Sequence, residues 1–298
     1  MVMKVSHEVP RCLLLASQEF NDYDYCLPHL LDQDEEYKQY FLDAKKQGRY
    51  IVMDNSLHEL GESYQWDRLK HWLYELEPNE FMVPDAWMDY TQTHVYAKYW
   101  KQIPMPKKCI AVAVAQGKDL SDAWKSFRSL KELGYKVGLN LMQSSGKSES
   151  DYIKISKEIQ QWNLVDILYF ADSFGNMDPD EVSFIIDSLK KGWEGDIGFH
   201  SHNNKGYALG NSIRAIEKGI SFCDCTVTGM GRGAGNVTTE SLLMELDNKN
   251  IFDVDLSLLQ GTVSDFSILK SEYGWGTNMH YQYAANHNIH PTFVQTLS

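Results

Sequence analysis

The chain has 298 residues, of which 43% are hydrophobic, and it carries 28 basic against 41 acidic side chains. This length allows one large α/β barrel or two smaller domains, and either would bury a substantial core. The formal net charge of −13 argues against a broad phosphate-binding surface, because non-specific affinity for nucleic acid comes from clustered Lys and Arg. We therefore expect no nucleic-acid partner.

The sequence also bears on location. It contains no run of 18 or more apolar residues, and its first residues lack the apolar core of a signal peptide, so we expect neither a membrane span nor secretion. Five scattered cysteines predict free thiols and not a disulfide framework: Cys12, Cys26, Cys109, Cys223 and Cys225. These features predict a cytoplasmic protein.

Eight short apolar runs alternate with amphipathic stretches. Each run is bounded by polar residues or glycine, as in strands buried on both faces. The predicted strands are residues 12–16, 50–53, 81–83, 109–115, 137–142, 165–171, 197–200 and 222–227. Helical spacing is clear at residues 120–133 before Gly134, and Asp178 and Pro179 form a typical helix start.

About eight strand–helix units in roughly 250 residues predict a (β/α)8 TIM barrel over residues 1–249. An open doubly wound sheet is the alternative. Residues 250–298 do not continue the repeat. They predict a C-terminal extension with a helix at 256–269 and an aromatic segment at 273–293, which would pack on the barrel, act as a lid or form a homodimer contact.

The most specific local pattern is the pair His200 and His202 at the end of the seventh predicted strand. Residues i and i+2 of a strand share a face, so both imidazoles aim at one point, as ligands of a divalent cation do. The alternative is two hydrogen-bonded histidines in a polar loop.

A glycine-rich segment follows the eighth predicted strand. Four glycines between residues 229 and 235, among them Gly231 and Gly233, let the backbone turn tightly and approach a ligand. Asn236 would either cap the next helix or reach a cation, and Arg232 is a candidate for binding a substrate carboxylate or phosphate.

Two other strand ends carry polar side chains. Asp172 and Ser173 end the sixth predicted strand, where Asp172 would act in catalysis or cap the following loop. Asn140 and Gln143 lie at the exit of the fifth predicted strand, where their amides could bind a substrate oxygen.

The motifs GLNLMQ, ADSFG, GFHSHNN and GMGRGAGN, in this order, resemble the C-terminal half of the DRE-TIM metallolyases over residues from about 135 to 298. That superfamily includes hydroxymethylglutaryl-CoA lyase and 4-hydroxy-2-oxovalerate aldolase. The resemblance implies that His200 and His202 bind a divalent metal (Mn, Mg, Zn or Co), with Asn236 as a further ligand. It implies carbon–carbon cleavage or formation on a 2-oxo acid or acyl substrate, through an enolate that the metal stabilises.

The beginning of the chain departs from this family. In the family, the first strand carries a Thr-Leu-Arg-Asp-Gly type motif, whose Arg stabilises the enolate and whose Asp completes the metal site. The first predicted strand here ends in Gln18 and Glu19 instead. Asp54, Glu19 and Asp85 are the candidates for a third ligand, in that order. The missing Arg predicts impaired catalysis.

Residues 11 to about 128 instead resemble the tRNA-guanine transglycosylase-like proteins of phages, through YDYCLPHLL, GRYIVMDNSLHELGE, FMVPDAWMDYTQT and AVAQGKDLSDAW. This resemblance implies that Asp54 binds a purine and that Asp224 attacks the sugar, although the zinc motif of that group is missing. The sequence therefore predicts a half-barrel chimera with a seam near residues 130–135. Three functions follow: a metal-dependent aldolase or lyase, a base-exchange or purine-binding protein, and a catalytically idle barrel.

Overall fold

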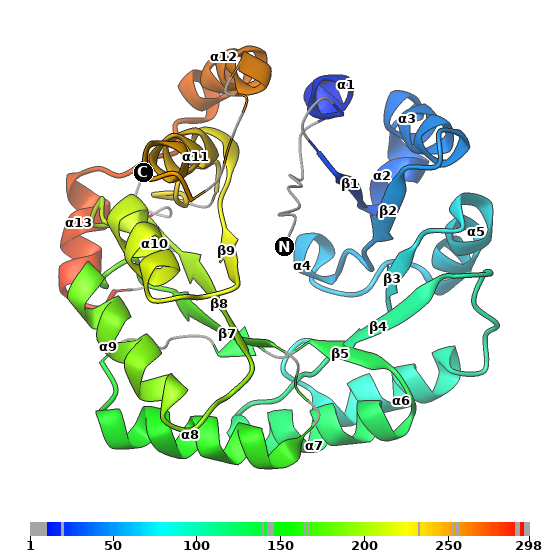
Figure 1. The fold of residues 1–298 in the computed structure, drawn as a ribbon. Coiled ribbons are helices and arrows are strands. Elements are labelled where there is room, and N and C mark those ends of the chain that lie inside the picture. The colour runs from blue at the N-terminus through cyan, green and yellow to red at the C-terminus, as the bar shows by residue number, and fades with distance from the viewer. Residues whose placement is uncertain are drawn as a thin grey trace. The chain divides into compact units, whose positions relative to one another are not determined.

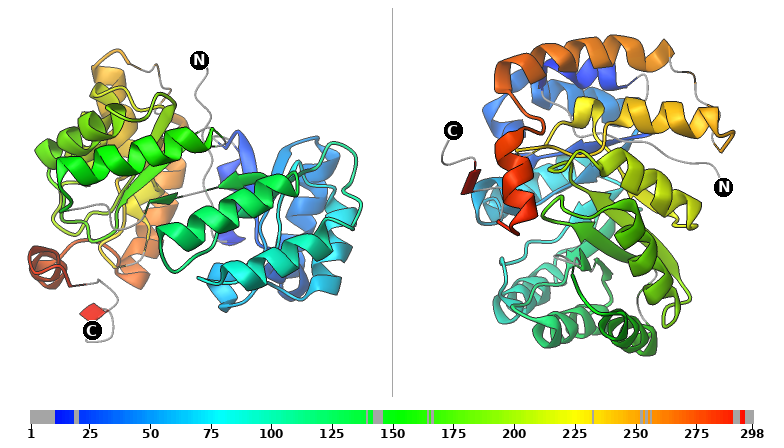
Figure 2. Two further views of the ribbon diagram at one scale, coloured as in Figure 1. Left: turned by 90° about the horizontal axis from the view of Figure 1, so that it is seen from below. Right: turned by 90° about the vertical axis from the view of Figure 1, so that its left-hand side faces the viewer.

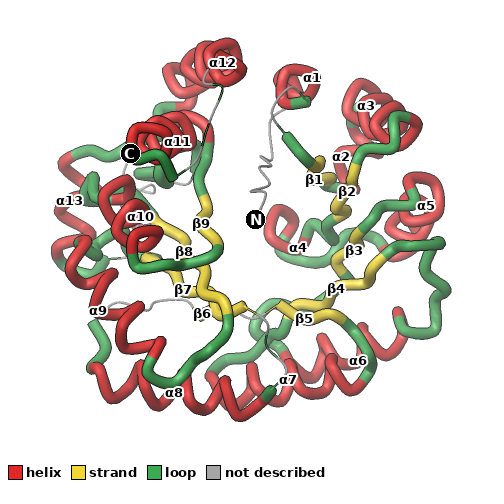
Figure 3. The backbone as a smooth tube through the Cα atoms, viewed as in Figure 1, coloured by secondary structure: helices red, strands yellow, loops and turns green. Residues whose placement is uncertain are grey.

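The computed structural model describes residues 11–18, 21–138, 140–141, 146–163, 165, 167–231, 233–251, 253, 255, 257–289 and 293–294. The chain divides into two compact units, Met1–Leu139 and Asn140–Ser298. In the described part of each unit, one parallel sheet lies beside helices that follow its strands in the sequence (Figure 1, Figure 3). No helix among the described residues is long and apolar enough to cross a membrane.

The first unit, coloured blue to green in Figure 1, holds a five-stranded parallel sheet in the order β1-β2-β3-β4-β5. The strands are β1 (Tyr23–Cys26), β2 (Tyr50–Met53), β3 (Glu80–Met82), β4 (Ile110–Val114) and β5 (Lys136–Gly138). The helices are η1 (Arg11–Leu13), α1 (Leu14–Ser17), α2 (Pro28–Gln33), α3 (Glu35–Lys46), α4 (Leu57–Leu60), α5 (Trp66–Leu76), α6 (Tyr90–Trp100) and α7 (Leu120–Glu132).

The predicted first strand at residues 12–16 is wrong, because the chain there forms η1 and α1. Its Leu and Ala residues favour a helix, and no β-branched residue opposes one. Strand β1 lies later and escaped prediction because polar Asp24 stands in its middle. Asp24 is buried and accepts hydrogen bonds from the Arg49 guanidinium at 2.5 and 3.0 Å and from the Tyr40 hydroxyl at 3.0 Å. This pairing allows a carboxylate inside the sheet.

The second unit holds a parallel sheet in the order β6-β7-β8-β9. Its strands are β6 (Asn140–Leu141), β7 (Ile167–Asp172), β8 (Asp196–Ser201) and β9 (Phe222–Asp224). Its helices are α8 (Glu149–Trp162), α9 (Pro179–Lys190), α10 (Ala208–Glu217), η2 (Val227–Gly229), α11 (Thr239–Asn248), α12 (Ser257–Tyr273) and α13 (Met279–Asn286). Figure 2 shows α8, α9 and α10 beside one another along the sheet of this unit.

Several local predictions are confirmed in detail. Strand β2 has the predicted bounds, and the Asp178 side chain caps α9 by accepting hydrogen bonds from the amides of its first turn, with Pro179 at the first position. The predicted helices at 120–133 and 256–269 correspond to α7 and α12. The predicted strand at 222–227 ends early, at Asp224, and the chain then enters the short helix η2.

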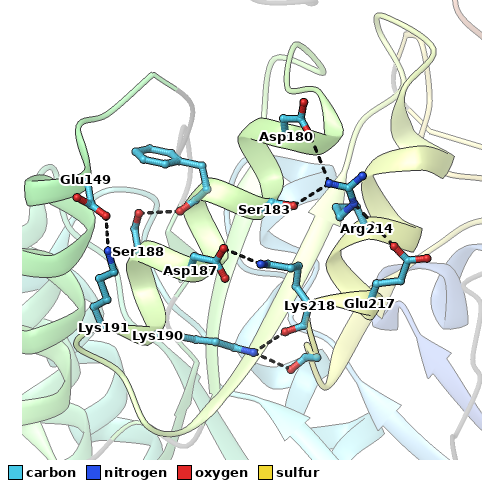
Figure 4. Close-up of polar contacts among 12 residues, drawn as sticks. Glu149, Asp180, Ser183, Asp187, Ser188, Lys190, Lys191, Arg214, Glu217 and Lys218 are labelled. Atoms are coloured by element: carbon cyan, nitrogen blue, oxygen red, sulfur yellow. Dashed lines mark hydrogen bonds and ion pairs between the residues drawn. The ribbon is translucent and has the colours of Figure 1, made fainter.

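Helices α9 and α10 are joined by polar contacts on their exposed sides (Figure 4). Lys218 of the loop after α10 pairs with Asp187 at 2.6 Å, and Arg214 pairs with Asp180 at 3.3 Å. The Lys190 ammonium donates to the carbonyl oxygens of Lys218 and Gly219. These contacts tie the two helices together beside the sheet.

Candidate metal centre

Strand β8 carries His200, and His202 follows directly after the strand. The two Nε2 atoms lie 3.3 Å apart, and the ring centroids are separated by 4.9 Å. At metal–nitrogen distances of about 2.0–2.1 Å, two nitrogens that bind one cation lie about 2.9–3.4 Å from each other. The two histidines therefore converge with the spacing that a shared cation requires.

Asp224 sets the orientation of the His200 ring. The two residues are partners in the β8–β9 register, and an Asp224 carboxylate oxygen lies 2.9 Å from Nδ1 of His200. The carboxylate favours the tautomer with its proton on Nδ1, which leaves Nε2 with the lone pair that a metal ligand needs. Asp224 would thus orient His200 as a metal ligand from the side opposite to Nε2.

Tyr169 of β7 supports the same carboxylate from the neighbouring strand. Its hydroxyl donates a 2.6 Å hydrogen bond to the other Asp224 oxygen. The Tyr169 ring lies so close to Gly198 that a Cβ at that glycine would stand 2.2 Å from the ring. Because residue 198 is glycine, the Tyr169 ring has room to lie over β8 and reach Asp224 on β9.

Tyr169 is not among the expected site residues, which for this strand are the polar side chains at its end, Asp172 and Ser173. The alternation of side chains between the two faces of the strand could have identified Tyr169 from the sequence. In the register of β7 and β8, Ala171 pairs with His200 and Tyr169 pairs with Gly198, so Tyr169 shares the face of the histidines.

Asn236 lies opposite His202 in an isolated antiparallel bridge. Its amide nitrogen donates to the Met230 carbonyl at 3.2 Å, which fixes the direction of the side chain. Its Oδ1 is buried and has no hydrogen-bond partner among the described residues. Since directly opposed residues place their side chains on the same face, the Asn236 side chain lies on the face of His202, with an oxygen that has no donor among the described residues.

Gly231 and Gly233 shape the loop that presents Asn236. A Cβ at Gly231 would lie 2.6 Å from the Asn236 amide nitrogen. A Cβ at Gly233 would lie 2.8 Å from the Tyr281 ring, and Gly233 has a φ of +62°. Both glycines thus allow close packing within the loop and against α13. Arg232 between them lies outside the described residues.

Asn140 lies on β6, paired with Tyr169 of β7, and the structure describes its backbone but not its side chain. Gln143 lies outside the described residues. The role in substrate binding that we expect for these two amides stays a prediction.

Asp172 occupies the face of β7 opposite to that of the histidines, because its register partner is Ser201 and not His200. It is fully buried, and its carboxylate accepts hydrogen bonds from the backbone amides of Asn176 and Met177 at 3.0 and 3.3 Å. Burial raises the pKa of Asp172 to about 7. This placement favours the loop-capping role over the catalytic role that we expected. Ser173, the next residue, is buried at the start of that loop.

The acidic candidates of the first unit lie after its strands. Asp54 follows β2 directly, its carboxylate accepts from the amide of Ser56 at 3.3 Å, and burial raises its pKa. Asp85 follows β3, is 4% exposed, and accepts hydrogen bonds from the side-chain amides of Asn55 and Gln116 at 2.8 and 2.5 Å. Burial and the nearby Asp54 charge raise the pKa of Asp85. Glu19 lies outside the described residues.

Across the described ranges, no three His, Cys, Asp or Glu side chains come together in a group that could hold a metal ion. The donor set that the second unit offers is two imidazole nitrogens and one amide oxygen, from His200, His202 and Asn236. This mixed set of nitrogen and oxygen donors suits divalent cations of intermediate hardness. The residues present fit a divalent metal, and a fourth ligand would come from solvent, substrate or a carboxylate.

The chain belongs to the HMGL-like family, whose model matches residues 107–263. The structure confirms the predicted α/β class with parallel strands, and the family match places the chain in a TIM-barrel family, as the sequence predicted. This match also confirms the resemblance to the DRE-TIM metallolyases for the C-terminal half of the chain.

The curated relatives include 4-hydroxy-2-oxovalerate aldolases. The enzyme of Geobacillus genomosp. 3 is 35% identical over 154 residues, which cover 51% of this chain and 45% of that enzyme. The enzyme of Carboxydothermus hydrogenoformans is 38% identical over 116 residues, which cover 39% of this chain and 34% of that enzyme. The chain thus spans less than half the length of these two relatives.

Among solved structures, the N-terminal domain of an aldolase candidate from Bacteroides vulgatus is similar, with a TM-score of 0.62 and 29% identity, over 79% of this chain and 77% of that chain. The carboxyl transferase domain of Rhizobium etli pyruvate carboxylase has a TM-score of 0.59 at 12% identity, over 83% of this chain and 46% of that chain. The second likeness concerns the fold alone.

Proposed function

We propose that the protein is a divalent-metal-dependent carbon–carbon lyase or aldolase that acts on a small 2-oxo acid. The observation that carries this proposal is the convergence of the His200 and His202 Nε2 atoms next to Asn236, the bridge partner of His202, whose side-chain oxygen has no hydrogen-bond partner among the described residues. Family membership and the aldolase relatives support the reaction class.

His200, His202 and Asn236 would hold the cation (Mn, Mg, Zn or Co). When bound, it would act as a Lewis acid toward the oxygens of the 2-oxo acid. Asp224 keeps the proton of His200 on Nδ1, and Tyr169 keeps Asp224 in place. Arg232 would bind the substrate carboxylate, with Gly231 and Gly233 allowing its approach, and the amides of Asn140 and Gln143 and the hydroxyl of Ser173 would contact substrate oxygens.

Asp54 is our first candidate for the remaining metal ligand or proton acceptor, ahead of Glu19 and Asp85. Burial raises the pKa of Asp54, which makes its carboxylate a better proton acceptor than an ordinary Asp. Cytoplasmic location and a homodimer contact through the C-terminal segment remain predictions as well.

Pyruvate release from a 4-hydroxy-2-oxo acid, followed with and without added Mn²⁺, tests this function. We expect turnover that requires the metal and that falls at least 100-fold in His200→Ala and His202→Ala. His71→Ala, which changes an exposed histidine of α5, is the control and should retain activity. Absence of turnover with Mn, Mg, Zn and Co alike, for a range of 4-hydroxy-2-oxo acids, would favour a catalytically idle barrel.

The transglycosylase-like resemblance of residues 11 to about 128, and with it the chimera, stays a separate hypothesis. The burial of Asp54 and Asp85 after adjacent strands is compatible with a base-binding role. Against the nucleophilic role, Asp224 already contacts both His200 and Tyr169. Thermal unfolding with millimolar guanine-like bases is the test, and an unchanged Tm would argue against base binding.

A further inference from the structure

Thr228, in the loop between β9 and α11, has a backbone conformation that its residue type disfavours. Its φ and ψ are 52° and 17°, in the left-handed region, where a β-branched residue is rare. The residue is 5% exposed, so solvent does not hold it in this conformation. Such a conformation persists where surrounding contacts enforce it.

Those contacts come from the C-terminal segment of the same unit. The Thr228 carbonyl accepts two hydrogen bonds of 3.1 Å, one from the Lys270 ammonium at the end of α12 and one from the Trp275 indole. On its other side, the Thr228 amide donates to Glu240 at 3.0 Å. Both polar groups of the Thr228 peptide backbone are thus held by side chains distant in the sequence.

The following residues extend this attachment to the loops around the histidines. The Gly276 amide donates to the Gly233 carbonyl at 3.0 Å, and the Thr277 hydroxyl donates to the Asn204 carbonyl at 2.6 Å. Residues 270–277 therefore supply four donors to carbonyls that flank His202 and Asn236 in the sequence.

The Thr228 conformation is transmitted to Asn236 by the backbone. The next carbonyl, that of Gly229, accepts a hydrogen bond from the Asn236 amide at 3.2 Å. The Met230 carbonyl then accepts from the Asn236 side chain. A change at Thr228 would therefore move both acceptors that orient Asn236.

We propose that Lys270 and Trp275 are positioning residues, which hold Thr228 and so aim the Asn236 oxygen at the cation beside His202. This proposal rests on the proposed function, because it assigns the cation to that site. It gives the C-terminal extension a part in metal binding in addition to packing.

The test uses the full chain with Lys270→Met and Trp275→Phe, singly and together, because each removes one donor and keeps most of the side-chain volume. We expect hydrogen exchange in residues 228–236 of the metal-free protein to become at least 10-fold faster in the double variant. We expect its affinity for Mn²⁺ to fall about 10–100-fold, the loss typical of outer contacts that orient metal ligands.

Two matched controls lie elsewhere in the same unit. Lys190→Met removes an ammonium that donates to the carbonyls of Lys218 and Gly219, as Figure 4 shows, and Trp193→Phe removes an indole that donates to the Asp196 carbonyl at 2.9 Å. Both changes delete the same kinds of hydrogen bond at a distance from the histidines. They should leave exchange in residues 228–236 and Mn²⁺ affinity within twofold of the wild type.

The proposal would be overturned if hydrogen exchange in residues 228–236 of the double variant were no faster than in the controls. It would also be overturned if the wild type binds Mn²⁺ and the double variant binds it with the same affinity. A wild type that binds no Mn²⁺, Mg²⁺, Zn²⁺ or Co²⁺ would overturn the aiming of Asn236 at a cation together with the proposed function. In that case, accelerated exchange would still show that Lys270 and Trp275 hold the loop.

Discussion

At the scale of single residues, the contact between Asp224 and Nδ1 of His200 would determine how His200 binds a metal. Without it, neutral His200 can carry its proton on either nitrogen and rotate about its side-chain bonds. With it, and with Tyr169 holding the carboxylate at 2.6 Å, the lone pair of Nε2 points toward His202. Tyr169 and Asp224 would thus belong to the site as residues that orient a ligand without binding the metal themselves.

We expect Asp224→Ala to weaken the binding of Mn²⁺ or Zn²⁺ about 10–100-fold, because His200 loses the group that fixes its tautomer. Calorimetric titration of the metal measures this. The control is Asp196→Ala at the other end of β8, which should bind as the wild type does. Equal affinities in Asp224→Ala and the wild type would contradict the orienting role.

Asp172 makes a prediction about pH. Because burial raises its pKa to about 7, from about 3.9 in an unfolded chain, the folded state binds the proton more tightly. The stabilisation that protonated Asp172 gives to the folded state is complete below the unfolded pKa and is lost as the pH rises through 7. As the pH rises from 5 to 8, we expect the free energy of unfolding of Asp172→Asn, measured with denaturant, to rise by ~1–3 kcal/mol relative to that of the wild type. Parallel pH profiles would argue against a protonated Asp172.

At the scale of elements, the predictable parts are those in which residue type and burial agree. Strands β2, β7 and β8 were found because their apolar runs are bounded by polar residues, and α9 because Asp178 and Pro179 begin it. Strand β1 could not be found this way, since Asp24 is acceptable there through its partners Arg49 and Tyr40, which are 25 and 16 residues away.

Local sequence patterns likewise predict only part of the site. The period of two along a strand predicted that His200 and His202 converge, and applied to β7 it would have separated Tyr169 from Asp172. The contact of Asp224 with His200 depends on the register between β8 and β9, which one sequence does not contain. The attachment of Thr228 by Lys270 likewise depends on where a distant helix ends.

The pairing that permits β1 makes a prediction about stability. Arg49→Met would leave the Asp24 carboxylate, which is 3% exposed, without its guanidinium partner. Removing one member of such a buried pair costs about 3–5 kcal/mol, and we expect a loss of about 3 kcal/mol in denaturant unfolding. Arg128→Met, which breaks the exposed pair with Glu132, should change stability by less than about 1 kcal/mol. Similar losses in the two variants would contradict this account of β1.

At the scale of the whole molecule, the chain combines two compact units, each with its own parallel sheet. The family match begins at residue 107 and so includes the end of the first unit and most of the second, where the histidines lie. The acidic balance of the chain is compatible with a small substrate bound at a local site, since an oxo acid needs one or two basic contacts and not a basic surface.

We infer that His200, His202 and Asn236 hold one divalent cation. The most direct test is metal content per chain after equilibrium dialysis against Mn²⁺ or Zn²⁺, with folding of every variant checked by circular dichroism. We expect one tightly bound ion in the wild type, weaker binding in Asn236→Ala, and none in the variant that combines His200→Ala with His202→Ala. A wild type without bound metal, or a double variant that retains its full complement, would contradict it.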